Sequence, residues 1–104
     1  MTYYILDGKT PVAEPDIKKW TSSFEKRNRK VKLSIIGDTK ISTVFIGIDP
    51  VFGFGPPLLF ETMVFGGELD GEQERCSTWD EAEKMHESVC QRVRDAEIKS
   101  VGKT

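Results

Sequence analysis

The chain has 104 residues with 38% apolar, 10% aromatic and 31% charged residues and a net charge of -2, which is the profile of a soluble globular protein rather than a disordered one. This length predicts one domain, residues 1–104, with a single core. No apolar run approaches the roughly 20 residues of a membrane span, and the first residues do not have the pattern of a secretion signal, so we expect a cytoplasmic protein without a membrane partner. Cys76 and Cys90 fit no metal-ligand spacing and are expected to be reduced thiols.

The charge is unevenly distributed along the chain. Residues 1–40 carry nine Lys or Arg and five Asp or Glu, a balance of +4, whereas residues 41–104 carry six and twelve, a balance of -6. A chain with opposite charges at its ends can associate head to tail with its own copies or present a local cationic patch. The net negative charge disfavours duplex nucleic acid as a partner, because duplex binding needs many phosphate contacts.

The first third of the chain predicts a strand, a turn and a helix. Tyr3–Leu6 is a short strand, and the "DGKTP" that follows it has the composition of a turn. A helix is expected from Pro15 to Arg27, because Pro15 suits a first helical turn and apolar residues recur behind it at helical spacing.

Several β-rich runs occupy the middle of the chain. "KVKLSIIG" and "KISTVFIGID" are divided by Gly37-Asp38, which predicts a hairpin. The second run has apolar side chains on both of its faces, so a central strand covered on both sides is expected. Pro57–Phe65 predicts another strand, and "RCS" at residues 75–77 predicts a short final one.

The last third predicts a long helix. Thr78 and Glu81 form a T-x-x-E capping box at its start. One face of the helix is marked by Ala82, Met85, His86, Val89, Val93 and Ala96. The order of elements predicts an α+β fold, in which an antiparallel sheet of about four strands carries one N-terminal helix and the long C-terminal helix.

Glu61 is a lone carboxylate in the apolar run Pro57–Phe65, which makes it the first candidate for a ligand-binding residue. Burying an unpaired carboxylate is costly, so Glu61 is expected to be paired, solvated in a pocket, or neutral. In a pocket it would accept hydrogen bonds from a ligand, and at a wet edge it would pair with a structural cation. Arg75 is a candidate for that cation and also for contact with a ligand anion.

His86 is the only histidine and lies on the apolar face of the predicted C-terminal helix. If that helix covers the sheet, His86 can meet Glu61, and each group would satisfy the other. Such a contact is the minimum for acid–base chemistry, whereas a packed, hydrogen-bonded core histidine is the more common case. In a binding protein the same imidazole is a candidate ligand contact.

The loop "DPVFGFGPP" presents two phenylalanines between glycines and prolines. Held near the surface, Phe52 and Phe54 would suit stacking against a planar base or docking into a partner subunit. The alternative is a hydrophobic loop folded onto its own core.

The segment "KRNRKVK", Lys26–Lys32, packs five cations into seven residues. A ligand phosphate would fit there, with Arg29 and Lys30 as its contacts. The alternative is structural, because cations are favoured at the C-terminus of a helix and this segment joins the predicted helix to the next strand.

Motifs of known chemistry are absent from the sequence. It contains no H-E-x-x-H or C-x-x-C metal motif, no G-x-S-x-G nucleophile motif, no phosphate loop and no dinucleotide fingerprint. We therefore expect no metal and no cofactor, and a binding protein rather than an enzyme. A hydrolase that uses Glu61 and His86 is a further alternative.

The runs "ISTVFIGIDPVFGFGPPLLFETMVFGG" and "STWDEAEKMH" together resemble a set of small proteins encoded by tailed phages and prophages. Small phage proteins of this size and composition are often inhibitors of host defence. One such group is the sponge proteins, compact homo-oligomers that sequester cyclic nucleotide signals of systems such as CBASS or Thoeris.

The resemblance implies an anti-defence sponge in the host cytoplasm, a homo-oligomer whose partner is a small nucleotide ligand. In that interpretation Phe52 and Phe54 stack on a base, Glu61 binds its polar edge, and Arg75 or the basic segment meets phosphate. A site at a subunit boundary would explain how so short a chain encloses a ligand. The alternative is a protein–protein inhibitor of a host defence enzyme, which would use the same aromatic loop.

Overall fold

The elements of the chain are known from a computed structural model, which describes residues 2–26, 29–49 and 55–101. In chain order they are β1 (Thr2–Asp7), β2 (Thr10–Ala13), α1 (Ile17–Lys26), β3 (Lys30–Ile36), β4 (Thr39–Phe45), β5 (Ile48–Asp49), β6 (Phe60–Phe65), β7 (Gln73–Cys76) and α2 (Trp79–Val101). The sequence did not predict β2, and it placed β5 in one continuous strand with β4.

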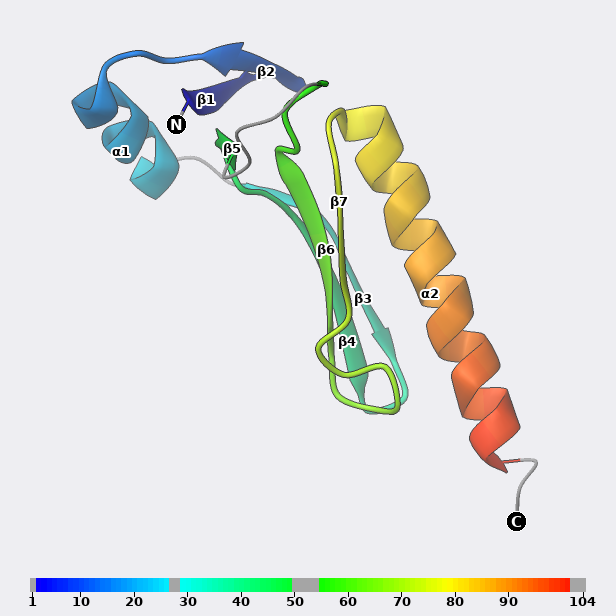
Figure 1. The fold of residues 1–104 in the computed structure, drawn as a ribbon. Coiled ribbons are helices and arrows are strands. Elements are labelled where there is room, and N and C mark those ends of the chain that lie inside the picture. Colours follow the sequence, from blue (N-terminus) through cyan, green and yellow to red (C-terminus); the bar gives the residue numbers. More distant parts are fainter. Residues whose placement is uncertain (1, 27–28, 50–54, 102–104) are drawn as a thin grey trace.

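Four strands in the spatial order β3-β4-β6-β7 form an antiparallel sheet, called the main sheet below. The predicted hairpin joins β3 to β4, with Gly37 at a φ of 59° in its turn. The long helix α2 runs along one face of the main sheet and contacts all four strands (Figure 1). The predicted α+β fold, with an N-terminal helix and a long C-terminal helix, is confirmed.

Strands β2, β1 and β5 form a second antiparallel sheet, the small sheet, near one end of the main sheet (Figure 1). Helix α1 packs on β1, and Trp20 Nε1 donates a hydrogen bond to the Tyr4 carbonyl oxygen at 3.0 Å. The chain passes from β4 to the small sheet at Gly47, where φ is 67° and a Cβ would lie 2.5 Å from the Phe24 ring and 2.9 Å from the Tyr4 carbonyl oxygen. Only glycine fits this close crossover, which is why β5 is separate from β4.

Both helices begin at a capping side chain. The Thr78 hydroxyl accepts a hydrogen bond from the Glu81 backbone N–H at 3.1 Å, so the predicted cap of α2 is confirmed. Asp16 Oδ1 accepts a hydrogen bond from the Lys18 backbone N–H at 2.9 Å. Asp16 is therefore the N-cap of α1, and Pro15 precedes this helix instead of starting it.

A continuous series of aromatic rings links the small sheet and α1 to the main sheet and α2. Successive ring centroids lie between 4.6 Å and 6.4 Å apart. In order, the rings belong to Tyr3, Trp20, Phe24, Phe45, Phe60 and Trp79.

The inner face of the main sheet, which α2 covers, is built in three layers. Nearest the small sheet is an apolar cluster of Leu6, Phe45, Leu59, Phe60 and Ala82. Next is a buried polar layer of Thr43, Thr62 and His86. Farther along α2 is a second apolar cluster of Ile41, Val64, Val89, Cys90 and Val93. The predicted apolar face of the helix thus supplies side chains to all three layers.

The opposite side of the main sheet, the outer face, is not covered by the described residues. Its side chains, at the paired strand positions, are Lys30, Leu33, Ile35, Lys40, Ser42, Val44, Glu61, Met63, Phe65, Gln73 and Arg75. On β4, Lys40 is exposed and Ser42 and Val44 are half-buried. The expectation that this strand is covered on both sides is therefore wrong for the described part of the chain, although the strand is central.

Candidate ligand-binding site

Glu61 lies on the outer face and is paired with a cation. Its partner is Arg75, which is directly opposite on β7, with Arg75 Nε donating to Glu61 Oε2 at 2.9 Å. The Glu61 side chain is 14% exposed and that of Arg75 is 34% exposed. Of the alternatives that the sequence left open, pairing with a structural cation is the one observed.

His86 is fully buried between α2 and the inner face and is hydrogen-bonded through both ring nitrogens. Its Nε2 lies 2.8 Å from Ser34 Oγ, and its Nδ1 lies 2.7 Å from Thr43 Oγ1. Thr43 Oγ1 lies in turn 2.5 Å from Thr62 Oγ1, so the polar layer forms a connected chain of hydroxyl groups and imidazole. Burial, and secondarily the Lys32 ammonium, lower the pKa of His86 below its usual value, which favours the neutral ring.

The contact between Glu61 and His86 that the sequence allowed is not formed. Glu61 points to the outer face, whereas its neighbour Thr62 points to the inner face and is bonded within the layer that holds His86. Side chains on opposite faces of one sheet cannot share a proton, so these two groups do not form an acid–base pair. In the described residues His86 is a packed core histidine with no exposed surface.

The remaining predicted contacts lie elsewhere in the chain. Phe52 and Phe54 lie outside the described residues. The Arg29 guanidinium carbon lies 4.0 Å from the centroid of the Phe24 ring, and Lys30 is exposed at the start of β3. Two predicted contacts lie beside a hollow: Arg75 lines a shallow, open groove between β7 and α2, and Arg29 lines a more enclosed hollow.

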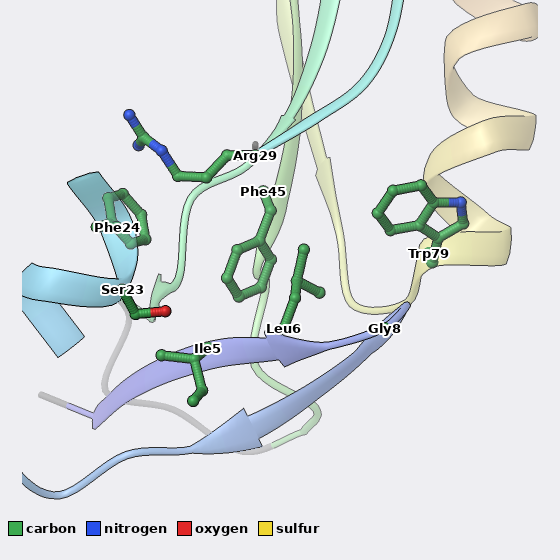
Figure 2. A pocket seen from close by; sticks show the side chains of 8 residues that line it. All are labelled: Ile5, Leu6, Gly8, Ser23, Phe24, Arg29, Phe45 and Trp79. Carbon is green, nitrogen blue, oxygen red and sulfur yellow. The ribbon is translucent and has the colours of Figure 1, made fainter. Parts of the chain in front are cut away.

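That hollow, the junction pocket, has a volume of about 140 Å³ and lies where α1, the small sheet, the main sheet and the start of α2 meet (Figure 2). Its lining residues are Ile5, Leu6, Gly8, Ser23, Phe24, Arg29, Phe45 and Trp79. Figure 2 shows the Ser23 side chain directed from α1 toward the middle of the hollow. The pocket is thus assembled from segments that are far apart in the sequence.

The junction pocket has an aromatic lining, and two cationic side chains lie over its rings. Phe24 and Trp79 stand on either side of Phe45 in Figure 2. The Arg29 guanidinium lies over the Phe24 ring, and Lys9 Nζ lies 5.7 Å from the centroid of the Trp79 ring. Aromatic faces with adjacent cations suit a planar ring that carries negative charge.

Sequence reasoning missed most of this pocket. Phe24 has the helical spacing of a core position, and no motif marks Trp79 as a site residue. A partial signal was present, because Trp79 directly follows the helix cap and Gly8-Lys9 forms a tight turn of the kind that often approaches ligands. Nothing local in the sequence indicates that these two segments meet.

Other reactive groups in the described residues are structural. No group of three or more His, Cys, Asp or Glu side chains in residues 2–26, 29–49 and 55–101 could hold a metal ion. Burial, and then the nearby Glu81, raise the pKa of the Cys76 thiol to about 11, and Cys90 is buried. The Cys76 thiol is therefore not activated as a nucleophile.

The comparisons add no relative to these observations. In the described part of the chain, neither helix is both long and apolar enough to cross a bilayer. Comparisons of the chain with protein families, with curated proteins and with solved structures gave no match.

Proposed function

We propose that this protein is a non-enzymatic binding protein that holds a small nucleotide at the junction pocket and, as its resemblance to phage proteins implies, sequesters a nucleotide signal of host defence. The observation that carries the proposal is the aromatic pocket with two cationic side chains beside it, Arg29 and Lys9. A nucleotide has a planar base, which can stack on aromatic rings, and a negative phosphate, which can bind the cations.

The size of the pocket limits which part of the ligand enters. Pockets that enclose a drug-sized ligand measure roughly 300–1,000 Å³. The junction pocket, at about 140 Å³, has room for one ring system and not for a whole nucleotide. We therefore place the base against the aromatic lining and the sugar and phosphate outside, along the surface that carries the cations.

The position of Arg29 supports phosphate binding at that surface. Arg29 precedes β3 and is exposed, so its guanidinium reaches solvent while it covers the Phe24 ring. A guanidinium can bind a phosphate through two parallel hydrogen bonds and stack on an aromatic ring at the same time. Lys30, the next residue in the chain, is also exposed and carries a second positive charge.

The proposal is tested by thermal unfolding with a panel of cyclic dinucleotides and cyclic ADP-ribose species. A ligand at about 100 times its Kd stabilises the folded state by roughly 2.7 kcal/mol, which gives a clear rise in Tm. The matched variants are Arg29→Glu and Arg94→Glu, since Arg94 is an exposed cation on α2 away from the pocket lining. Arg29→Glu should weaken binding by roughly 10- to 100-fold, the size of a lost charge-assisted hydrogen bond, and Arg94→Glu should leave it unchanged.

Four results would contradict the proposal. If no member of the panel stabilises the protein at millimolar concentration, a nucleotide is rejected as the ligand. An equal loss of binding in Arg29→Glu and Arg94→Glu would reject the junction pocket as the binding site, because the net charge of the protein would then account for the effect. Recovery of cleaved rather than intact ligand after heat denaturation would identify a hydrolase. Capture of a host enzyme without any ligand response would favour the alternative, a protein–protein inhibitor.

A further inference from the structure

The junction pocket contains one side-chain hydroxyl in a mainly apolar lining. Ser23, on α1, is the only Ser, Thr, Asn or Gln among the described residues that line it. Its hydroxyl is directed toward the middle of the hollow (Figure 2). The indole N–H of Trp79, the other uncharged polar group of the lining, already donates a hydrogen bond to Glu83 Oε1 at 2.6 Å. Ser23 is therefore the uncharged side chain that is available to a molecule inside the pocket.

The Ser23 hydroxyl is not used by the helix that carries it. A serine or threonine inside a helix commonly donates a hydrogen bond to the carbonyl oxygen one turn earlier. Thr21 does so, with its Oγ1 donating to the Ile17 carbonyl oxygen at 2.8 Å. Ser23 is half-buried, and its hydroxyl makes no hydrogen bond within the described part of the chain. Because buried polar groups are satisfied by a protein group or by another molecule, whatever fills the hollow has to supply this hydrogen bond.

This requirement determines which rings the pocket accepts. A hydrocarbon ring would leave the hydroxyl buried without a partner, which costs roughly 5- to 150-fold in affinity. A nucleobase carries ring nitrogens, carbonyl oxygens or amino groups along its edge. A serine hydroxyl can donate a hydrogen bond to the first two and accept one from the third. A base can thus stack on the aromatic lining and bind Ser23 at the same time.

We propose that the Ser23 hydroxyl binds the polar edge of the base in the junction pocket, and that this contact makes the pocket select a heterocyclic base over a hydrocarbon ring. The inference rests on the proposed function, because it takes a nucleotide as the ligand. It adds a specificity-determining residue and one orientation of the base, with its hydrogen-bonding edge toward α1 and its sugar toward solvent. The volume of about 140 Å³ is consistent with this arrangement, since only the ring has to enter.

A titration followed by NMR chemical shifts tests the contact with two kinds of probe. The first is the set of monophosphates of adenosine, guanosine, cytidine and uridine, and the second is benzene, a ring that enters apolar cavities of this size. Ser23→Ala removes the hydroxyl and keeps a good helix former. It should raise the Kd of the tightest-binding monophosphate about 3- to 10-fold and lower the Kd of benzene at least about threefold. Changes of opposite sign cannot come from a general loosening of α1.

The neighbouring serine provides the matched control. Ser22 is also half-buried on α1 but does not line the pocket. Ser22→Ala should therefore leave the Kd of both probes within about twofold of the parent. A cooperative melt of each variant confirms that it is folded.

The other outcomes separate a failure of this inference from a failure of the proposed function. If none of the four monophosphates binds at about 10 mM, both are rejected. If a monophosphate binds and Ser23→Ala leaves its Kd unchanged, the proposed function stands and Ser23 is rejected as the contact. Equal weakening by Ser23→Ala and Ser22→Ala also rejects Ser23. If benzene binds the parent more tightly than every monophosphate, the pocket selects a hydrocarbon ring, as it would for an aromatic side chain of a protein partner.

Discussion

Glu61 and Thr62 are neighbours on β6, yet Thr62 is buried under α2 in a chain of hydrogen bonds, and Glu61 lies on the outer face beside Arg75. The same contrast runs along the whole main sheet. The inner face carries apolar clusters on both sides of a connected polar layer, and the outer face mixes apolar side chains with an ion pair. Alternation along a strand thus gives one segment two environments, and a residue's chemistry follows from which face α2 covers.

The largest difference in stability between the two faces is expected when a phenylalanine on each face of β6 is replaced by alanine. Phe60 has no exposed surface, so Phe60→Ala should lower the free energy of unfolding by about 3–5 kcal/mol. Phe65 is 43% exposed, so Phe65→Ala should cost less than about 1 kcal/mol. Chemical denaturation measures both. Equal costs for the two variants would contradict the assignment of faces.

A smaller effect is expected at the polar layer. Thr43→Val removes a hydroxyl that lies between His86 Nδ1 and Thr62 Oγ1 and should destabilise the protein by about 1–3 kcal/mol, because buried polar groups lose their partner. Ser42→Ala, one position away on the outer face, is the matched control and should cost within about 0.5 kcal/mol. A Thr43→Val protein as stable as the parent would mean that the layer tolerates an apolar replacement.

The polar layer also predicts how stability depends on pH. The pKa of His86 is lowered by burial, and by Lys32, below the ordinary value of 6.5, so on acidification the unfolded chain binds a proton that the folded protein does not. Stability should therefore fall as the pH drops below about 6.5, by up to about 1.4 kcal/mol per pH unit, and level off once the folded protein also binds the proton. Since His86 is the only histidine, His86→Gln should remove the slope between pH 6.5 and 5. A slope that persists in this variant would assign it to other groups.

The smallest effect is expected for the ion pair of the outer face. A double-mutant cycle with Glu61→Gln and Arg75→Gln should give a coupling of about 0.5–1 kcal/mol, because both side chains are partly exposed to solvent. The same cycle on Lys32 and Glu87, a pair of exposed side chains that joins β3 to α2, should give less. A coupling larger than about 2 kcal/mol for the first pair would indicate that Glu61 is desolvated by a partner on the outer face.

Local patterns in the sequence predicted most of the elements. The capping residue Thr78, the apolar spacing of α2 and the turn at Gly37 each act within a few residues, so their effects can be read without the fold. Alternation along β6 also places Glu61, Met63 and Phe65 on one face and Thr62 on the other. What it could not supply was the face that α2 covers, since that depends on packing between segments far apart in the chain.

The small sheet and the junction pocket were not predictable for a related reason. The pairing of β1 with β5 joins Tyr3 to Ile48, and the pocket brings Gly8 close to Trp79. Such contacts leave no periodic signal, because each partner segment is short and satisfies only local turn or strand preferences. Arg29 could be predicted because its charge is visible in the sequence, whereas its aromatic neighbour Phe24 has only the apolar helical spacing that is typical of a core position.

The aromatic series gives the protein an intrinsic fluorescence reporter. Both tryptophans of the chain belong to it, Trp20 against α1 and the small sheet and Trp79 in the wall of the junction pocket. Trp20 donates its indole N–H to a backbone carbonyl, whereas Trp79 donates its own to Glu83 at 2.6 Å. Replacing either indole by phenylalanine therefore leaves one tryptophan emitter. Trp79 should report on a ligand added to test the proposed site, and Trp20 should report on separation of the N-terminal helix from the small sheet, so the two events can be followed optically without any added dye.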